Sequence, residues 1–279
     1  MIETPAIAQA YWDEMARLYW LTGPPLRPTD EDILLLERLV ARHAPRKDSE
    51  PSRALMLGVT PAIAAMRWPE RSRLLAVDGS FAMVKCVWPA VLPAGRAAVC
   101  GEWFSLPFAS QSLDVITGDG SANCVSYPEG LRKLAEETRR VLRSGGCLFL
   151  RCYAQPDLKE EPERVLAGLG DGGYPSFHDF KFRFLMSMQE TAHRGVALAE
   201  VHRRWVKSGN DPERLASATG WDPAVIGALD AYRDSPTVHV FPTLAEFRAV
   251  LGEYLEEISC SYATYPLAER CPVLVLKAL

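Results

Sequence analysis

The 279-residue sequence lacks the features that identify membrane and nucleic-acid-binding proteins. It has no apolar run near 20 residues and no basic segment followed by an apolar core at its start, so neither a membrane span nor a secretory signal is predicted. With 31 Lys and Arg against 35 Asp and Glu, the net charge of −4 offers no basic surface to a polyanion. We therefore expect a cytoplasmic protein that binds neither membrane nor nucleic acid.

Cysteine and histidine are present, but not in the spacings that hold metals or disulfides. The seven cysteines include no C-x-x-C pair and mostly lie in apolar, strand-like segments, so we expect reduced core residues. The five histidines include no i, i+4 pair, and no metal site is predicted. With 48% apolar residues, the chain can bury one large core, alone or with an added segment.

What the sequence does contain is a strand, a tight turn and a second strand, in the order that nucleoside-binding sites use. Leu55 to Leu57 form a short apolar run, typical of a strand buried on both faces, and Gly58 permits a turn that a ligand can approach closely. Thr60 is predicted to cap a following helix, whose N-terminus favours a carboxylate or phosphate. Residues 74–77 then predict a second strand, which ends at Asp78, where a carboxylate can accept both hydroxyls of a ribose.

The glycine pattern of dinucleotide-binding proteins is incomplete in this turn. The three glycine positions of G-x-G-x-x-G are occupied by Gly58, Thr60 and Ile63, and the Thr60 side chain would meet a closely approaching pyrophosphate. The spacing from Gly58 to Asp78 suits either a dinucleotide or another nucleoside. A nicotinamide-dependent oxidoreductase is therefore disfavoured, and the segments after Asp78 must show which nucleoside is bound.

Three later segments carry a family resemblance. Residues 101–108 read G-E-W-F-S-L-P-F, residues 113–116 read L-D-V-I, and residues 137–146 read E-T-R-R-V-L-R-S-G-G. In this order and at these separations, residues 54–154 resemble the class I S-adenosylmethionine-dependent methyltransferases.

The resemblance implies S-adenosylmethionine as the cofactor and assigns residues to its parts. Asp78 would hold the ribose, Glu102 would face the adenine amino group, and Trp103 or Phe104 would pack on the ring. Residues 118–121 would lie beside the methionine portion. The implied cofactor-binding residues are Gly58, Thr60, Asp78, Gly79, Met83, Gly101, Glu102, Trp103, Asp119 and Gly120.

The first motif departs from the family pattern, acid-x-G-x-G-x-G. Met56 replaces the acid, and only Gly58 remains of the three glycines, because Thr60 and Ala62 replace the others. Loss of the acid removes a negative charge near the cofactor's ammonium and sulfonium. We hypothesise that Asp119 binds the ammonium instead, while the Thr60 hydroxyl serves the cofactor carboxylate.

The expected fold is α/β, with a doubly wound, mostly parallel seven-stranded sheet whose last strand is antiparallel. Residues 1–50 would form an N-terminal helical lid, and residues 51–154 the cofactor-binding part. Residues 155–235 would form a helical insertion over the acceptor, and residues 236–279 a helix and strand hairpin that complete the sheet.

Two amphipathic segments have a structural and a functional interpretation each. Tyr11, Met15, Leu18 and Tyr19 share one helical stripe, which could pack on the sheet or close over the cofactor. Residues 177–188 are rich in Phe and Met and could line an acceptor cavity, although we expect at least half of them to be ordinary core.

Methyl transfer from a sulfonium depends mainly on positioning, and a general base is needed only for a protonated acceptor. The candidate catalytic residues are Asp119, His178 and Tyr127, with Tyr153 as a further candidate base. A small-molecule acceptor, methylated on O, N or C, is the leading prediction. The alternative is a catalytically silent, methyltransferase-like binding or scaffold protein. The acceptor identity stays open, as does the oligomeric state, with a homodimer among the options.

Overall fold

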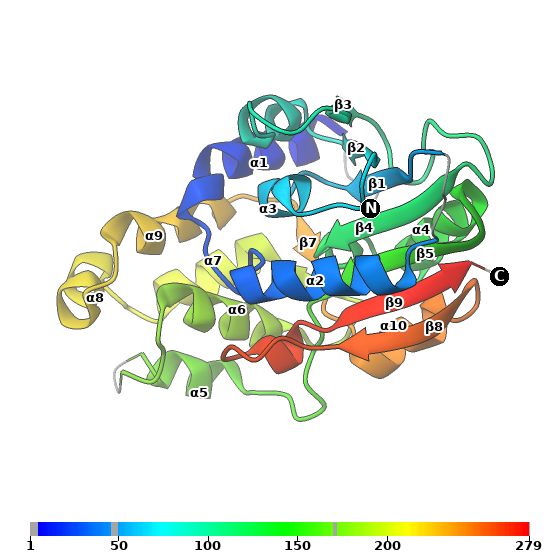
Figure 1. Ribbon diagram of the computed structural model, residues 1–279. Helices are drawn as coiled ribbons and strands as arrows, with labels where there is room; N and C mark the ends of the chain where they lie inside the picture. Colours follow the sequence, from blue (N-terminus) through cyan, green and yellow to red (C-terminus); the bar gives the residue numbers. More distant parts are fainter. Residues whose placement is uncertain (1–4, 46–49, 170–171, 279) are drawn as a thin grey trace.

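A seven-stranded sheet forms the centre of the computed structural model, which describes residues 5–45, 50–169 and 172–278 (Figure 1). Across the sheet lie β3 (Arg96–Cys100), β2 (Arg73–Asp78), β1 (Arg53–Leu57), β4 (Leu113–Asp119), β5 (Leu142–Arg151), β9 (Val273–Ala278) and β8 (Leu255–Ser261). Neighbouring strands are parallel, except that β9 runs against both β5 and β8. The predicted α/β fold with an antiparallel last strand is confirmed.

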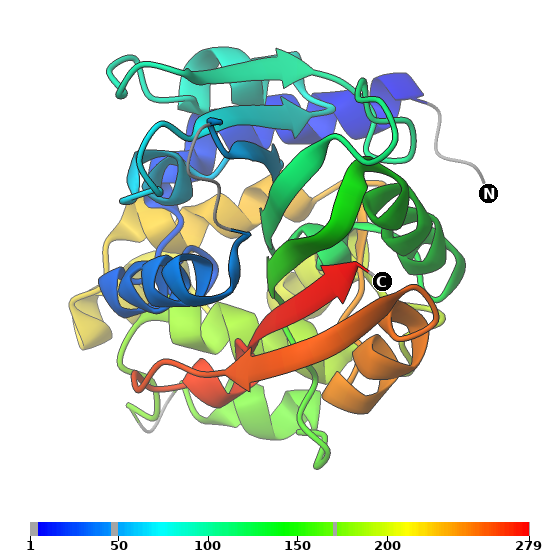
Figure 2. The ribbon, with the colours of Figure 1, turned by 45° about the vertical axis from the view of Figure 1, so that its right-hand side comes forward.

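Helices cover both faces of this sheet (Figures 1 and 2). They are α2 (Asp30–His43) and α3 (Pro61–Ala65) on one face, and α4 (Glu129–Val141) and α10 (Leu244–Leu251) on the other. Strand β1 shows why both faces are apolar: Leu55 and Leu57 pack with α4 and α10, whereas Ala54 and Met56 pack with α2 and α3. The continuous apolar run of β1 is thereby buried on both sides, as predicted.

Side-chain caps fix where several helices begin. Thr29 caps α2 and Thr243 caps α10, and each forms a capping box with the acid three residues later. Thr60 occupies the N-cap position of α3, but the expected capping hydrogen bond from its side chain is absent. The Thr60 side chain borders a cavity instead.

The inserted segment, residues 155–235, lies beside the carboxyl ends of the parallel strands and packs into a second core together with Tyr11, Phe241 and Cys271 (Figure 1). It contains α5 (Pro162–Ala167), α6 (Phe177–Met188), β6 (Val196–Ala197), α7 (Leu198–Lys207), α8 (Pro212–Thr219), α9 (Pro223–Gly227) and the 3₁₀ helix η4 (Ala228–Tyr232); β6 pairs with β7 (Val238–His239). Phe177, Phe180, Phe182 and Phe184 are all buried in this core. The expectation that most of this stripe is core is confirmed.

The N-terminal helix α1 (Pro5–Leu18), continued by the 3₁₀ turn η1 (Tyr19–Leu21), lies across the same end of the sheet. It packs between η4 and the π-helical turn η2 (Met83–Val87). The helices α1 and α6 therefore approach the sheet's carboxyl edge from two sides.

In the part of the chain that the structure describes, no helix combines the length and apolarity needed to cross a membrane.

Candidate active site

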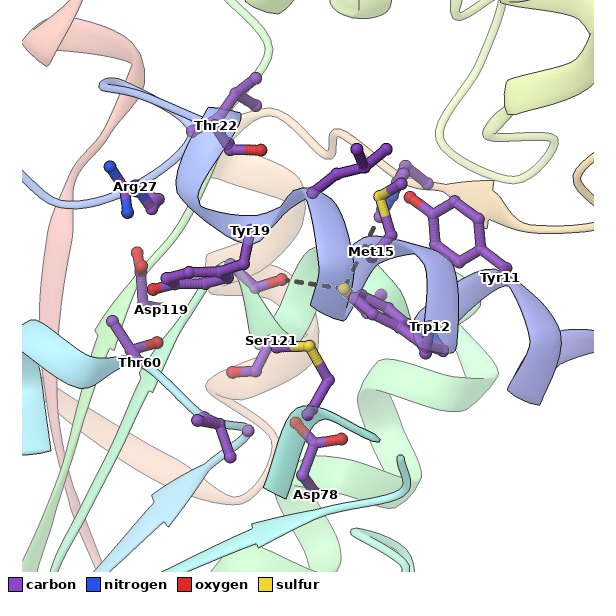
Figure 3. A pocket seen from close by; sticks show the side chains of 18 of the residues that line it. Tyr11, Trp12, Met15, Tyr19, Thr22, Arg27, Thr60, Asp78, Asp119 and Ser121 are labelled. Atoms are coloured by element: carbon purple, nitrogen blue, oxygen red, sulfur yellow. Dashed lines mark hydrogen bonds between the residues drawn. The ribbon is translucent and has the colours of Figure 1, made fainter. Parts of the chain in front are cut away.

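A cavity with two adjoining compartments lies at the carboxyl ends of β1, β2 and β4 (Figure 3). The strand order reverses between β1 and β4, and open α/β sheets bind ligands at such a reversal. The inner compartment lies beneath α1 and α6, and the outer compartment lies above the ends of β2 and β3. Both compartments are bordered by Trp12, Asp78, Trp103 and Cys124.

The ten residues expected to bind the cofactor all line these two compartments. The inner compartment is lined by Gly58, Thr60, Asp78, Met83, Trp103, Asp119 and Gly120. The outer compartment is lined by Asp78, Gly79, Gly101, Glu102 and Trp103. Segments distant in sequence therefore form one continuous wall.

The turn after β1 requires glycine. Gly58 has φ +88°, where an L side chain is strained, and its N–H donates to the Val77 carbonyl at 2.8 Å. The Trp103 indole N–H donates to the same carbonyl at 2.7 Å. A Cβ on Gly58 would lie 3.5 Å from the Trp103 ring and 3.7 Å from an Asp78 carboxylate oxygen. The absence of that side chain keeps the space between β1 and Asp78 open.

Asp78 ends β2 with its carboxylate at the boundary of the two compartments. One oxygen accepts the Ser80 N–H at 2.8 Å. Burial raises the pKa of Asp78, and hydrogen bonds from the Ser80 and Val59 N–H groups partly oppose that rise. The carboxylate is thus held in place by backbone donors and can still accept hydrogen bonds from a ligand.

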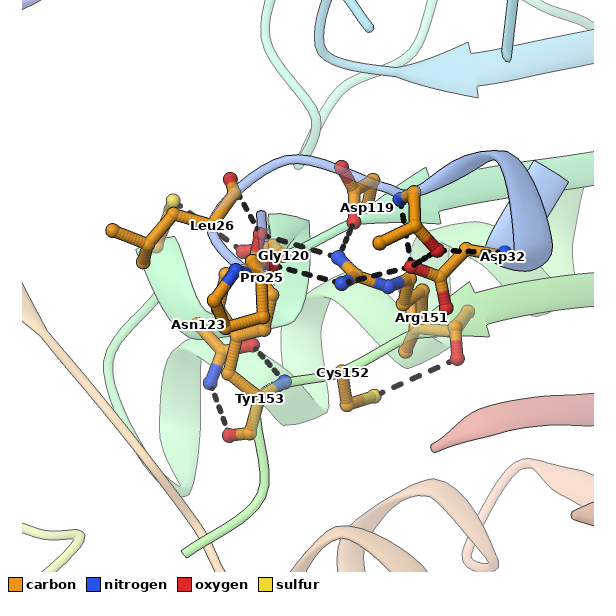
Figure 4. Close-up of polar contacts among 12 residues, drawn as sticks. Pro25, Leu26, Asp32, Asp119, Gly120, Asn123, Arg151, Cys152 and Tyr153 are labelled. Atoms are coloured by element: carbon orange, nitrogen blue, oxygen red, sulfur yellow. Dashed lines mark hydrogen bonds and ion pairs between the residues drawn. The ribbon is translucent and has the colours of Figure 1, made fainter. Parts of the chain in front are cut away.

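Asp119, at the end of β4, takes part in a buried ionic network (Figure 4). Its Oδ1 accepts from the Arg151 guanidinium at 2.6 Å, and Arg151 also lies 3.3 Å from Asp32 of α2. The same guanidinium donates to the Pro25 carbonyl and to the Tyr265 hydroxyl. Burial raises the pKa of Asp119, and Arg151 opposes this shift. Because two carboxylates share one guanidinium, the network contains one more acidic group than basic groups.

Aromatic and basic side chains complete the inner compartment (Figure 3). The predicted stripe of Tyr11, Met15, Leu18 and Tyr19 lines it, which supports the lid interpretation of α1. Arg27 stacks over the Tyr19 ring at 5.2 Å. Ser121, which belongs to the segment expected beside the methionine portion, also lines this compartment. Five further lining residues were not expected from the sequence: Arg27, Cys124, Lys181, Tyr232 and His239.

Burial governs the chemistry of these polar groups. It raises the pKa of the Cys124 thiol to about 12 and lowers the pKa of His239 to about 4, so both groups are neutral at pH 7. The Ser121 hydroxyl is buried and has no hydrogen-bond partner in the described part of the chain. It is a polar group that a ligand in the inner compartment could satisfy.

The candidate bases do not gather at one point. Asp119 and Tyr153 line the inner compartment, and the Tyr153 hydroxyl donates to the Leu26 carbonyl at 3.0 Å. His178 and Tyr127 line neither compartment: the His178 ring lies against Gly23, and Tyr127 packs edge-on to His193. Within residues 5–45, 50–169 and 172–278, no three His, Cys, Asp or Glu side chains are grouped to hold a metal ion.

Residues 55–150 match the family model described as "Methyltransferase domain". This segment runs from β1 to the end of β5 and contains the Gly58 turn, Asp78 and Asp119. No curated protein matches the sequence.

Several solved structures share the fold across nearly the whole chain. A Rhodobacter sphaeroides protein, described provisionally as a Zn-dependent alcohol dehydrogenase, is 12% identical, with a TM-score of 0.62 and coverage of 100% of both chains. A SAM-dependent methyltransferase from Methanosarcina mazei is 15% identical, with a TM-score of 0.51 and coverage of 86% of this chain and 97% of that one. A Haloferax volcanii methyltransferase, solved with its activator Trm112, is 15% identical, with a TM-score of 0.50 and coverage of 99% and 97%. At these identities the likeness concerns the fold.

Proposed function

We propose that the chain is a class I S-adenosylmethionine-dependent methyltransferase, a function supported by the methyltransferase domain that residues 55–150 match, and that it methylates a small molecule held in the inner compartment. The observation that carries this proposal is the meeting of Gly58, Asp78 and Trp103 at the strand reversal, next to a cavity lined by aromatic side chains. The α1 and α6 side chains that border this cavity leave it suited to a compact, partly apolar acceptor.

We assign the outer compartment to the adenosine part of the cofactor. Asp78 would accept hydrogen bonds from the ribose hydroxyls, and Glu102 would face the adenine. Gly79 and Gly101, which line this compartment, would border the base, and the Trp103 indole would lie beside the nucleoside at the boundary of the compartments. The Asp78 carboxylate suits this role because backbone N–H groups already fix its position.

We assign the part of the inner compartment near β1 and β4 to the methionine portion. Asp119 attracts the ammonium and sulfonium, because its ionic network has an excess acidic group. The unpartnered Ser121 hydroxyl and the Thr60 side chain lie where polar atoms of this portion need donors and acceptors. Arg27, on the lid side, is a candidate partner for the cofactor carboxylate.

When bound, S-adenosylmethionine supplies a methyl group that is already activated, and the departing thioether needs no proton. The chain's task is therefore to align the acceptor and exclude water. The aromatic residues of α1 and η1 cover the inner compartment and keep it apolar, and Tyr11 and Tyr232 present hydroxyls that can orient an acceptor. Two candidate bases line the compartment, and Asp119 is better placed than Tyr153 for a protonated acceptor, because the Tyr153 hydroxyl donates to the Leu26 carbonyl.

Titration calorimetry with S-adenosylhomocysteine tests the cofactor assignment. Asp78→Ala removes the ribose acceptor, and we expect affinity to fall by about 100-fold, the value of one or two charge-assisted hydrogen bonds. Glu70→Ala is the matched control, because Glu70 is an exposed carboxylate before the opposite end of β2, and it should leave affinity unchanged. Equal affinity of the Asp78→Ala variant and the unmodified protein would refute the assignment.

The acceptor class is tested by transfer of a labelled methyl group in a cell extract divided by dialysis. We expect label in the dialysable fraction. Label confined to the retained macromolecules would contradict a small-molecule acceptor without affecting the cofactor assignment.

A further inference from the structure

A buried cation without a partner borders the inner compartment. Lys181 of α6 lines this compartment and is only 4% exposed. Within residues 5–45, 50–169 and 172–278, no hydrogen bond or ion pair reaches its ammonium. Burial of an unpaired charge is costly, so buried lysines are normally paired.

The position of Lys181 follows from the pattern of α6. Phe177 precedes it by four residues and Phe184 follows it by three, so all three side chains share the buried stripe of the helix. The other basic residue of α6, Arg183, is paired with Glu160. One cation of this helix is therefore neutralised within the protein, and the other faces the cavity.

Neither carboxylate that lines the inner compartment pairs with Lys181. Asp119 binds Arg151, and Asp78 accepts backbone N–H groups at the compartment boundary. The charged groups that act on neighbouring His178 are Arg27 and Lys181, both cations. Burial lowers the pKa of Lys181 to about 8, so the ammonium form still predominates at pH 7.

We propose that the acceptor carries a carboxylate and that this carboxylate pairs with the Lys181 ammonium. The inference rests on the proposed methyl-transfer function, whose inner compartment it describes more closely. Lys181 belongs to the inserted segment, whereas the residues assigned to the cofactor follow β1, β2, β3 and β4. The acceptor's carboxylate, rather than the cofactor's, is therefore the anion assigned to Lys181.

The first experiment compares carboxylates with uncharged analogues of the same shape. Protein saturated with S-adenosylhomocysteine is titrated with benzoate, phenylacetate, cinnamate and 3-phenylpropionate, and with the primary amide of each. We expect at least one carboxylate to bind at least tenfold more tightly than its amide. Lys181→Met should abolish this preference, and Lys181→Arg should keep part of it, because the charge remains.

The matched control is Lys207→Met, since Lys207 is exposed on α7. It should leave the preference intact. If no carboxylate exceeds its amide in the unmodified protein, or if the preference survives Lys181→Met, the proposal is wrong. Failure of S-adenosylhomocysteine itself to bind would refute the cofactor assignment, and the two failures are thereby distinguished.

A second experiment separates the acceptor's carboxylate from the cofactor's. The affinities of S-adenosylhomocysteine and of 5′-methylthioadenosine, which lacks the amino-acid carboxylate, are measured for Lys181→Met. We expect both to equal those of the unmodified protein. A selective loss of S-adenosylhomocysteine affinity would place the cofactor carboxylate at Lys181 and overturn the proposal.

Discussion

Replacement of Lys181 by Met should stabilise the unliganded protein. Met has nearly the same length as the lysine stem, so packing against α6 neighbours is retained while the unpaired charge is removed. The pKa of Lys181 is lowered from 10.5 to about 8, and a tenfold change in proton affinity is worth about 1.4 kcal/mol. The buried charge therefore costs up to roughly 3 kcal/mol of unfolding free energy at pH 7.

The pH dependence has a definite sign. Between pH 8 and pH 10.5 the unfolded chain retains the lysine proton and the folded chain has lost it, so the stability of the unmodified protein rises with pH in this range. The advantage of Lys181→Met should be largest below pH 8 and disappear near pH 10.5.

Urea denaturation at several pH values, followed by circular dichroism, measures this difference, with Lys207→Met as the exposed control. A Lys181→Met variant that is less stable than the unmodified protein at pH 7, or an advantage that does not change with pH, would refute the reasoning. Either result would mean that the ammonium has a partner or ready access to water.

Three further predictions concern the sheet edge and the buried histidines. Arg151→Met should lower the unfolding free energy by about 3–5 kcal/mol, because it strands two buried carboxylates; a urea midpoint unchanged from the unmodified protein would argue against the network. Gly58→Ala should lower the unfolding free energy by about 1–2 kcal/mol, because position 58 has a positive φ, and it should weaken S-adenosylhomocysteine binding. The control Gly227→Ala, at a helical position with open space around it, should change neither stability nor binding. Thermal melting measures the stability, and calorimetry measures the binding. Burial lowers the pKa values of His178 and His239 from 6.5 to about 4. Between these pH values the unfolded chain binds protons that the folded chain does not, so the unfolding free energy should fall as the pH decreases from 6.5 towards 4. His239→Gln should flatten part of that loss in urea titrations, and an identical pH profile would contradict a buried, neutral His239.

The sequence predicted the fold well because its signals were local and redundant. Apolar runs marked β1, β2 and β4, and the segments after them follow a recurrent order, so the sheet could be assembled without knowing any contact between distant residues. The residues expected at the cofactor were found together for the same reason, since the carboxyl ends of parallel strands meet at one edge.

The acceptor side was harder to predict, because its residues come together only through tertiary packing. Lys181 stands in the chain as one of several basic residues, and Arg183 two positions later looks equivalent. The signal that could have found it is its place on the aromatic stripe of α6, three and four residues from buried phenylalanines. His178 stays an untested candidate base; its ring lies against Gly23 and does not line the cavity.

The guanidinium of Arg151 limits which segments of this chain can be exchanged in a chimeric protein. Through it the loop at Pro25, the start of α2, the end of β4 and the β8–β9 connection share a single charge centre (Figure 4). A chimera that grafts a foreign N-terminal segment onto β1 would keep every strand yet deprive this centre of Asp32 and the Pro25 carbonyl. Residues 25–32 are thus electrostatically inseparable from the sheet, and a functional transplant must carry them along.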